Sequence, residues 1–189
     1  MAYVGEIWDA VLAFNSALAL FNFCNDQAPR YFAQDQKLLQ QLNNWKLIAA
    51  RDGIWSIYNL GETIQYANPN VIKLPAFNTW VDYDKLRLAR RKFRAWFPDY
   101  ISIRHALGHI SETTKNTQER DKNYYKGPFK SNGMIVPGND TMIMIKNSLN
   151  GNSFQTTFKG RLLSYEISEQ TLKKLVMVKD EFFSGFSFP

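Results

Sequence analysis

The sequence predicts a mainly α-helical fold: a four- to five-helix up-and-down bundle with a small antiparallel β insertion, at about residues 134–167, before the last helix. Apolar side chains recur every three or four residues in four segments before residue 113, which is typical of amphipathic helices. Short strand-like runs separated by turn residues follow, and a last helical pattern ends the chain. Because 189 residues with 45% hydrophobic side chains suffice for one core, and no repeat divides them, we expect residues 1–189 to form a single domain.

The first two helices are predicted at residues 3–24 and at about residues 35–67. Apolar spacing defines both, and Asn68-Pro69-Asn70 is expected to end the second. Gly53 and Gly61 weaken that helix by about 1 kcal/mol each relative to alanine unless close packing compensates. We therefore expect a neighbouring helix to come close at these glycines.

The third and fourth helices are predicted at about residues 83–96 and 98–112. Asp82 or Asp84 supplies a carboxylate that can cap the third helix, and its apolar stripe is Leu86, Ala89, Phe93 and Trp96. Pro98 disfavours helical geometry at the residue before it but suits the first turn of a new helix. A break between the two helices is therefore expected at that proline.

The remaining elements are a loop, three strands and a last helix. Residues 113–133 are polar and lack periodicity, which predicts a loop of unassigned role. Strands are predicted at residues 141–145, 153–158 and 161–167, with Asn150-Gly151 and Lys159-Gly160 as turns. Ser168 can cap a helix that runs to about Phe183.

Positive charge is concentrated in one quarter of the chain. Residues 85–130 contain twelve Lys and Arg against Asp99, Glu112, Glu119 and Asp121. Such a basic surface suggests a polyanionic partner such as RNA, DNA or a nucleotide, although a solvated helix face gives the same pattern. The candidate RNA-backbone contacts are Arg87, Arg90, Arg91 and Arg94.

Cysteine and hydropathy patterns suggest a cytoplasmic protein. Cys24 is the only cysteine and lies in an apolar stretch, so we expect a buried, inert thiol and no disulfide. Residues 10–24 are apolar but short for a membrane span, and Glu6 and Asp9 stand where a signal peptide needs positive charge. No membrane association is expected.

Both histidines of the chain, His105 and His109, fall in the fourth predicted helix. Helical geometry places Ile103 and Leu107 toward the core, His105, His109 and Glu112 almost opposite, and Arg104 on the flank. An exposed or interface pair with an ordinary structural role is one interpretation. A metal site is another, but it lacks an obvious third ligand besides Glu112 or Asp99, so we expect no metal and no cofactor.

Acid–base chemistry on phosphodiesters is the third interpretation of the histidine pair. Histidine can exchange a proton with a ribose hydroxyl or a leaving oxygen, and arginine matches phosphate with a fork of donors. Arg104 and His109 are about 140° apart around the helix, so one copy cannot easily direct both at one phosphate. A homodimer could combine Arg104 of one chain with His109 of the other in a composite site.

The segment Arg104-His105-Ala106-Leu107-Gly108-His109 resembles the signature of HEPN domains, in which an arginine precedes a histidine near the end of a late bundle helix. The resemblance gives Arg104 and His109 the catalytic motif positions and His105 the polar position after the arginine. It implies a homodimer and metal-independent endoribonuclease activity, as in toxin–antitoxin or phage-defence systems with an antitoxin protein as partner.

Other functions stay open at this point. A non-catalytic HEPN-like dimer could bind RNA, a nucleotide or a protein through the same residues, and a metal-dependent hydrolase is a third class. Arg51 and Asp52 on the second helix could position the catalytic helix or line its groove, but a structural ion pair is the more common role for such residues. Together with Glu112 they are secondary site candidates.

Overall fold

A computed structural model describes residues 2–32, 34–72, 80–109, 115–131, 134–136 and 142–187. The helices in these ranges are α1 (Ala2–Tyr31), α2 (Gln36–Ile72), α3 (Tyr83–Trp96), α4 (Tyr100–Gly108), α6 (Thr117–Asn123) and α7 (Glu169–Phe183). The strands are β1 (Tyr125–Lys126), β2 (Phe129–Ser131), β3 (Met134–Val136), β4 (Met142–Ile143), β5 (Ser148–Asn150), β6 (Ser153–Phe158) and β7 (Arg161–Glu166). The chain is mainly helical with antiparallel strands before the last helix, as the sequence predicts.

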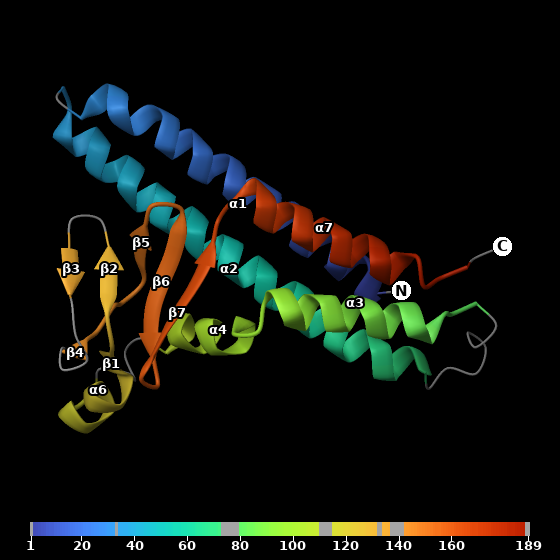
Figure 1. Ribbon diagram of the computed structural model, residues 1–189. Coiled ribbons are helices and arrows are strands. Elements are labelled where there is room, and N and C mark those ends of the chain that lie inside the picture. Colours follow the sequence, from blue (N-terminus) through green and yellow to red (C-terminus); the bar gives the residue numbers. More distant parts are fainter. Residues whose placement is uncertain are drawn as a thin grey trace.

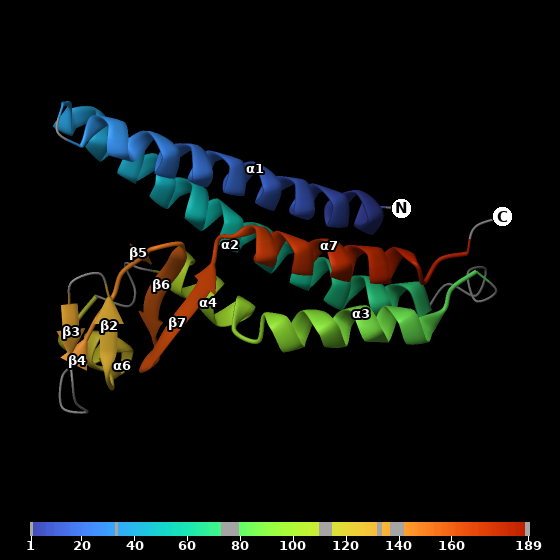
Figure 2. The same cartoon turned by 45° about the horizontal axis from the view of Figure 1, so that its top comes forward.

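The long helices α1 and α2 form an antiparallel pair that runs the length of the molecule (Figures 1 and 2). Helices α3 and α7 pack side by side along one half of this pair, and α4 packs on α2 next to the strands. Phe14, Phe21, Ile54, Ile57 and Leu60 are fully buried between the elements. The core therefore lies along the inner faces of α1 and α2, where burial of apolar surface stabilises the fold.

The glycines of α2 mark close approaches, as predicted. A Cβ at Gly61 would lie 2.5 Å from Phe93 of α3 and 2.7 Å from Tyr100 of α4. At Gly53 it would lie 3.1 Å from Ile167 and 3.5 Å from Phe14 of α1. The missing side chain at Gly61 thus lets α3 and α4 contact α2 at one point.

Two helices begin where the sequence places their caps. Asp82 accepts hydrogen bonds from the backbone N–H groups of Asp84 and Lys85 at the start of α3, and Ser168 accepts one from Thr171 at the start of α7. The bounds of α3, Tyr83–Trp96, match the predicted range. These caps satisfy N–H groups that the first helical turn leaves without an intrahelical partner.

Helix lengths differ from the predictions elsewhere. Helix α1 continues past residue 24 to Tyr31, with Pro29 in its last turn, and α2 continues through Pro69 to Ile72. A proline removes one helical hydrogen bond but does not force every helix to end. Helix α4 is shorter than predicted, because it begins at Tyr100 after the Pro98 turn and His109 forms its C-cap.

The predicted loop at residues 113–133 is wrong for its described part. It contains α6, β1 and β2, so the β elaboration begins at Tyr125 and not near residue 134. Asn116 starts α6 by accepting a hydrogen bond from the Glu119 N–H, and β1 pairs with the distant strand β4. Elements this short show no periodicity, and their partners lie far away in sequence.

The strands form small antiparallel sheets, β1 with β4, β2 with β3, and a three-stranded sheet in the order β5, β6, β7. The predicted strand near 141–145 is reduced to Met142–Ile143 among described residues, and β5 was not expected. Lys159 and Gly160, both with positive φ, form the two-residue turn between β6 and β7, as predicted. This turn reaches the end of α4.

Helix α1 is the most apolar of the long helices. Its residues Gly5–Tyr31 are long and apolar enough to cross a membrane by length and composition, so the expected limit of residues 10–24 was too short. The helix also packs against α2 and α7, and 44% of its apolar window is buried inside the protein. Cys24 is buried there, as predicted, and burial raises the pKa of its thiol.

Candidate functional site

His105 and His109 line one cleft at the end of α4. Their rings are stacked with centroids 5.8 Å apart and planes 24° from parallel. The cleft has a volume of about 380 Å³, and the other residues around it are Glu119, Lys122 and Asn123 of α6 together with Phe158 and Lys159. We call this the histidine cleft.

Asn123 holds two walls of the histidine cleft together. Its buried side chain donates through Nδ2 to the Glu119 carbonyl oxygen at 2.7 Å, and its Oδ1 accepts from the Lys159 backbone N–H at 2.9 Å. Helix α6 is thereby fixed to the turn between β6 and β7. The lysine takes the left-handed backbone conformation at this turn, with φ of 49°.

The charged groups of the cleft are two ammonium groups and one carboxylate. Lys122 Nζ lies 2.7 Å from Glu119 Oε1 in a partly exposed ion pair, and Lys159 Nζ lies 5.3 Å from the centre of the Phe158 ring. Exposed ion pairs of this kind contribute little and exchange readily with a stronger anion. Glu119 and Lys122 fall in the segment predicted as a loop, whereas Lys159 falls in a turn that the sequence predicts without a role in a site. That turn and the local positive charge are the sequence signals that point to these residues.

Arg104 lies on a different side of α4 and does not line the histidine cleft. Its guanidinium carbon is 5.1 Å from the ring centre of Trp55 and 5.2 Å from that of Tyr58, both on α2. Its Nε is buried without a hydrogen-bond partner, and no carboxylate pairs with it among the described residues. One chain therefore brings His105 and His109 together and keeps Arg104 apart.

Tyrosines and Glu62 continue the contact between α4 and α2. Tyr100 donates its hydroxyl proton to Glu62 Oε1 at 3.2 Å. Burial, reinforced by the carboxylate, raises the pKa of Tyr100 to about 12 and also raises the pKa of Tyr58. Both hydroxyls stay protonated at neutral pH, and that of Tyr100 links α4 to Glu62 of α2.

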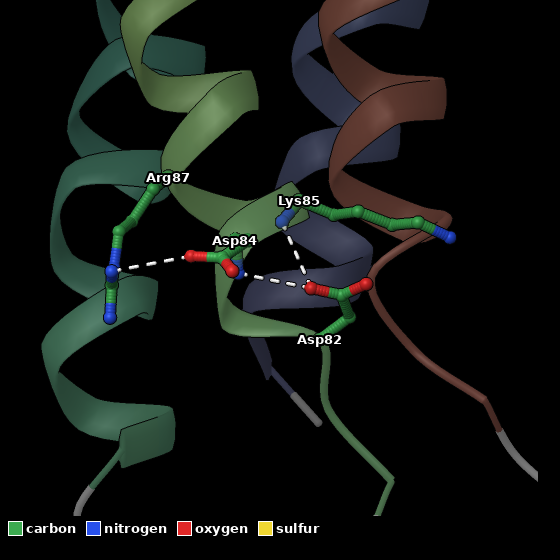
Figure 3. Close-up of polar contacts among 4 residues, drawn as sticks. All are labelled: Asp82, Asp84, Lys85 and Arg87. Atoms are coloured by element: carbon green, nitrogen blue, oxygen red, sulfur yellow. Dashed lines mark hydrogen bonds and ion pairs between the residues drawn. The ribbon is translucent and has the colours of Figure 1, made fainter.

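The four arginines predicted to contact RNA lie around one hollow of about 430 Å³ on α3, together with Asp84. Arg87 Nη1 lies 3.3 Å from Asp84 Oδ1, and Arg87 and Lys85 extend to opposite sides of the helix (Figure 3). Arg94 donates to Gln65 Oε1 of α2 at 2.5 Å. The structure therefore gathers Arg87, Arg90, Arg91 and Arg94 on the side of α3 that reaches α2.

The secondary candidates are less well defined. Arg51 and Asp52 are exposed, and neither side chain makes a hydrogen bond or ion pair within the part of the chain that the structure describes. Glu112 lies outside the described residues. Over the described ranges, no three His, Cys, Asp or Glu side chains lie close enough together to hold a metal ion.

Comparison with protein-family models, with curated proteins and with solved structures gave no match for this chain. The likeness to HEPN domains stays a prediction from the Arg104–His109 segment. The chemistry of the site has to be argued from its own residues.

Proposed function

We propose that this protein is an endoribonuclease that cleaves RNA without a metal ion, and that the histidine cleft is its active site. The observation that carries the proposal is the stacked pair His105 and His109 in a cleft that also holds Lys122 and Lys159. Two groups able to exchange protons near neutral pH, beside two fixed positive charges, are what phosphodiester transfer requires.

In the proposed reaction one imidazole accepts the proton of the ribose 2′-hydroxyl, and the oxygen attacks the neighbouring phosphorus. The bond from phosphorus to the 5′ oxygen breaks, and the other imidazole, which is charged, gives its proton to that leaving oxygen. The products are a 2′,3′-cyclic phosphate and a 5′-hydroxyl end. The ammonium groups of Lys122 and Lys159 stabilise the extra negative charge on the phosphate oxygens in the transition state.

A composite site in a homodimer is a second arrangement for the same chemistry. It would bring Arg104 of the partner subunit to His109, as the likeness to HEPN domains implies. The surface of α4 between these two residues favours it, because Ile101 is 45% exposed and a Cβ at Gly108 would meet no atom of the described residues within 4 Å. A role in a toxin–antitoxin or defence system, with an antitoxin as partner, belongs to this version of the proposal.

The test is an RNA cleavage assay on purified wild type and variants in the presence of a chelator. Each of His105→Ala and His109→Ala is expected to lower the rate by about 10²–10⁴-fold, the usual contribution of a positioned acid or base. Lys173→Gln on the exposed side of α7 is a control expected to keep full activity. Equal activity of wild type and His109→Ala, or loss of wild-type activity on chelation, would overturn the proposal.

A non-catalytic binding module is the other function to distinguish. The positive hollow on α3 favours it, because four arginines face one carboxylate there without any acid–base pair. This version predicts that RNA stays intact while it binds with an affinity that falls as salt rises.

A further inference from the structure

One face of α2 forms a continuous seam with α3 and α4. Arg51, Trp55, Tyr58, Glu62 and Gln65 are spaced alternately four and three residues apart, which places them on one side of the helix. We call the contact of this face with α3 and α4 the aromatic seam. Three contacts build it: Arg94 with Gln65, Tyr100 with Glu62, and Arg104 with the Trp55 and Tyr58 rings.

Positive charge follows the aromatic seam from end to end. Arg94 belongs both to the seam and to the arginine hollow on α3, so it joins the two. Arg104 comes next along α4, and helical spacing places the exposed Arg51 one turn beyond Trp55 on α2. The described carboxylates along this path include Glu62, which accepts from Tyr100, Asp84, whose exposed pair with Arg87 is weak, and the exposed Asp52 next to Arg51.

Arg104 is the most informative residue of the seam. An arginine beside a half-buried tryptophan and tyrosine would ordinarily find a carboxylate, yet none of the described residues supplies one. The two rings instead fix its guanidinium plane, so little side-chain entropy is lost when it binds an anion. A guanidinium held between two rings, with no ion pair to a described carboxylate, offers both a phosphate contact and, beside the indole, a stacking surface.

We propose that the aromatic seam binds single-stranded polynucleotide, with phosphates on the arginines and an unpaired base stacked at Trp55 and Arg104. Stacking on aromatic rings and guanidinium planes requires base faces that a duplex keeps covered, which is why the strand is single. Gly108, whose Cβ position no described atom approaches within 4 Å, lies between Arg104 and the two histidines around α4, so the strand can cross there to the histidine cleft. Only the identification of the strand as RNA rests on the proposed function.

The experiment measures binding of fluorescein-labelled single-stranded DNA by fluorescence anisotropy, since DNA lacks the 2′-hydroxyl and cannot be cleaved by the proposed reaction. We expect the single strand to bind at least about tenfold more tightly than a duplex of the same sequence, and Trp55→Ala to weaken it about five- to hundredfold. Trp55→Phe should retain most of the affinity. Phe23→Ala, which removes an exposed ring from α1, is the matched control.

The salt dependence of the DNA affinity distinguishes a phosphate contact from a purely structural role, because an arginine with only a structural role would not change it. Arg104→Gln and Arg91→Gln should each reduce the slope of log affinity against log salt by about 0.7, the value for one phosphate contact on a single strand. Lys173→Gln on α7 should leave the slope unchanged. Equal affinity for duplex and single strand, or an unaltered slope in folded Arg104→Gln, would overturn the inference.

The two proposals fail separately. If the protein cleaves RNA but shows no preference for single-stranded over duplex DNA, the proposed binding role of the aromatic seam is wrong, and the histidine cleft stays the proposed active site. If the protein binds single strands tightly but cleaves no RNA, the proposed nuclease activity is wrong, and the binding role of the aromatic seam stands.

Discussion

At the scale of single residues, Asn123 is the residue on which the shape of the histidine cleft depends. It was absent from the sequence interpretation, because an asparagine in a polar stretch carries no signal of burial. One of its two hydrogen bonds goes to the Glu119 carbonyl four residues earlier in α6, and the other accepts from the Lys159 N–H, 36 residues away in sequence. Long-range contacts of this kind exist only in the folded chain.

Asn123→Ala should lower both stability and RNA cleavage. The change removes the part-buried hydrogen bond to the Lys159 N–H, which costs about 0.5–1.5 kcal/mol, and it loosens the wall that carries Lys122. Urea unfolding and the cleavage rate measure the two effects. The exposed Gln118→Ala on the same helix is the control, and an unaltered rate in folded Asn123→Ala would show that this wall is not needed.

The histidine pair gives a prediction for the pH dependence of cleavage. One ring must be neutral to accept a proton while the other is charged to donate one, so kcat/KM should pass through a maximum and fall on both sides. His105→Ala and His109→Ala should each remove one limb of this profile, because each variant lacks either the proposed proton acceptor or the proposed proton donor. A wild-type rate that only rises with pH would contradict the assignment of both an acid and a base.

Tyr100 provides a prediction for stability at high pH. Its pKa is raised to about 12 in the folded protein, so between pH 10 and 12 the folded state holds a proton that the unfolded chain releases. The free energy of unfolding should therefore fall across this window. In Tyr100→Phe the decline should be shallower by up to about 1.4 kcal/mol per pH unit, as measured by urea unfolding at pH 9 and pH 11; an equally steep decline would contradict the assignment to this tyrosine.

At the scale of elements, α3 and α7 could be predicted, whereas α6 and the strands β1, β2, β3 and β5 could not. Asp82 and Ser168 are local caps that precede regular apolar stripes, so each helix is encoded in its own segment. Helix α6 has seven residues and β1 has two, too few to show a period, and β1 is defined by pairing with β4. The histidines could be proposed as a site from helical spacing, whereas the cleft around them depends on these unpredicted elements.

Gly61→Ala tests the point at which α2, α3 and α4 meet. The added methyl would lie 2.5–2.7 Å from ring carbons of Phe93 and Tyr100, so at least one ring must move, at a cost of about 1–3 kcal/mol. The free energy of unfolding should fall, and cleavage should weaken because Tyr100 belongs to α4. Gly5→Ala on α1 is the matched control, since nothing lies within 4 Å of its Cβ position and alanine favours the helix.

At the scale of the whole molecule, α4 is the element that both proposed surfaces share. Its His105 and His109 face α6 and the turn after β6, while its Tyr100 and Arg104 face α2. The offset of about 140° between Arg104 and His109 was readable from the sequence, but which neighbours occupy the two sides was not. Because the histidines and Arg104 face different sides of α4, a site within one chain uses the histidines without Arg104, whereas a composite site needs Arg104 from a second chain.

Mixing of Arg104→Gln with His109→Ala decides between these assemblies. If His109 works with Lys122 and Lys159 of its own chain and Arg104 only binds the strand, a refolded mixture of Arg104→Gln and His109→Ala should show no more than the summed activity of the two parents. The specific activity of the wild type should also stay constant on dilution, because no second chain completes the site. A composite site predicts the opposite: about half of the randomly paired dimers would carry one intact Arg104–His109 pair, so activity would return on mixing and fall on dilution below the dimer Kd.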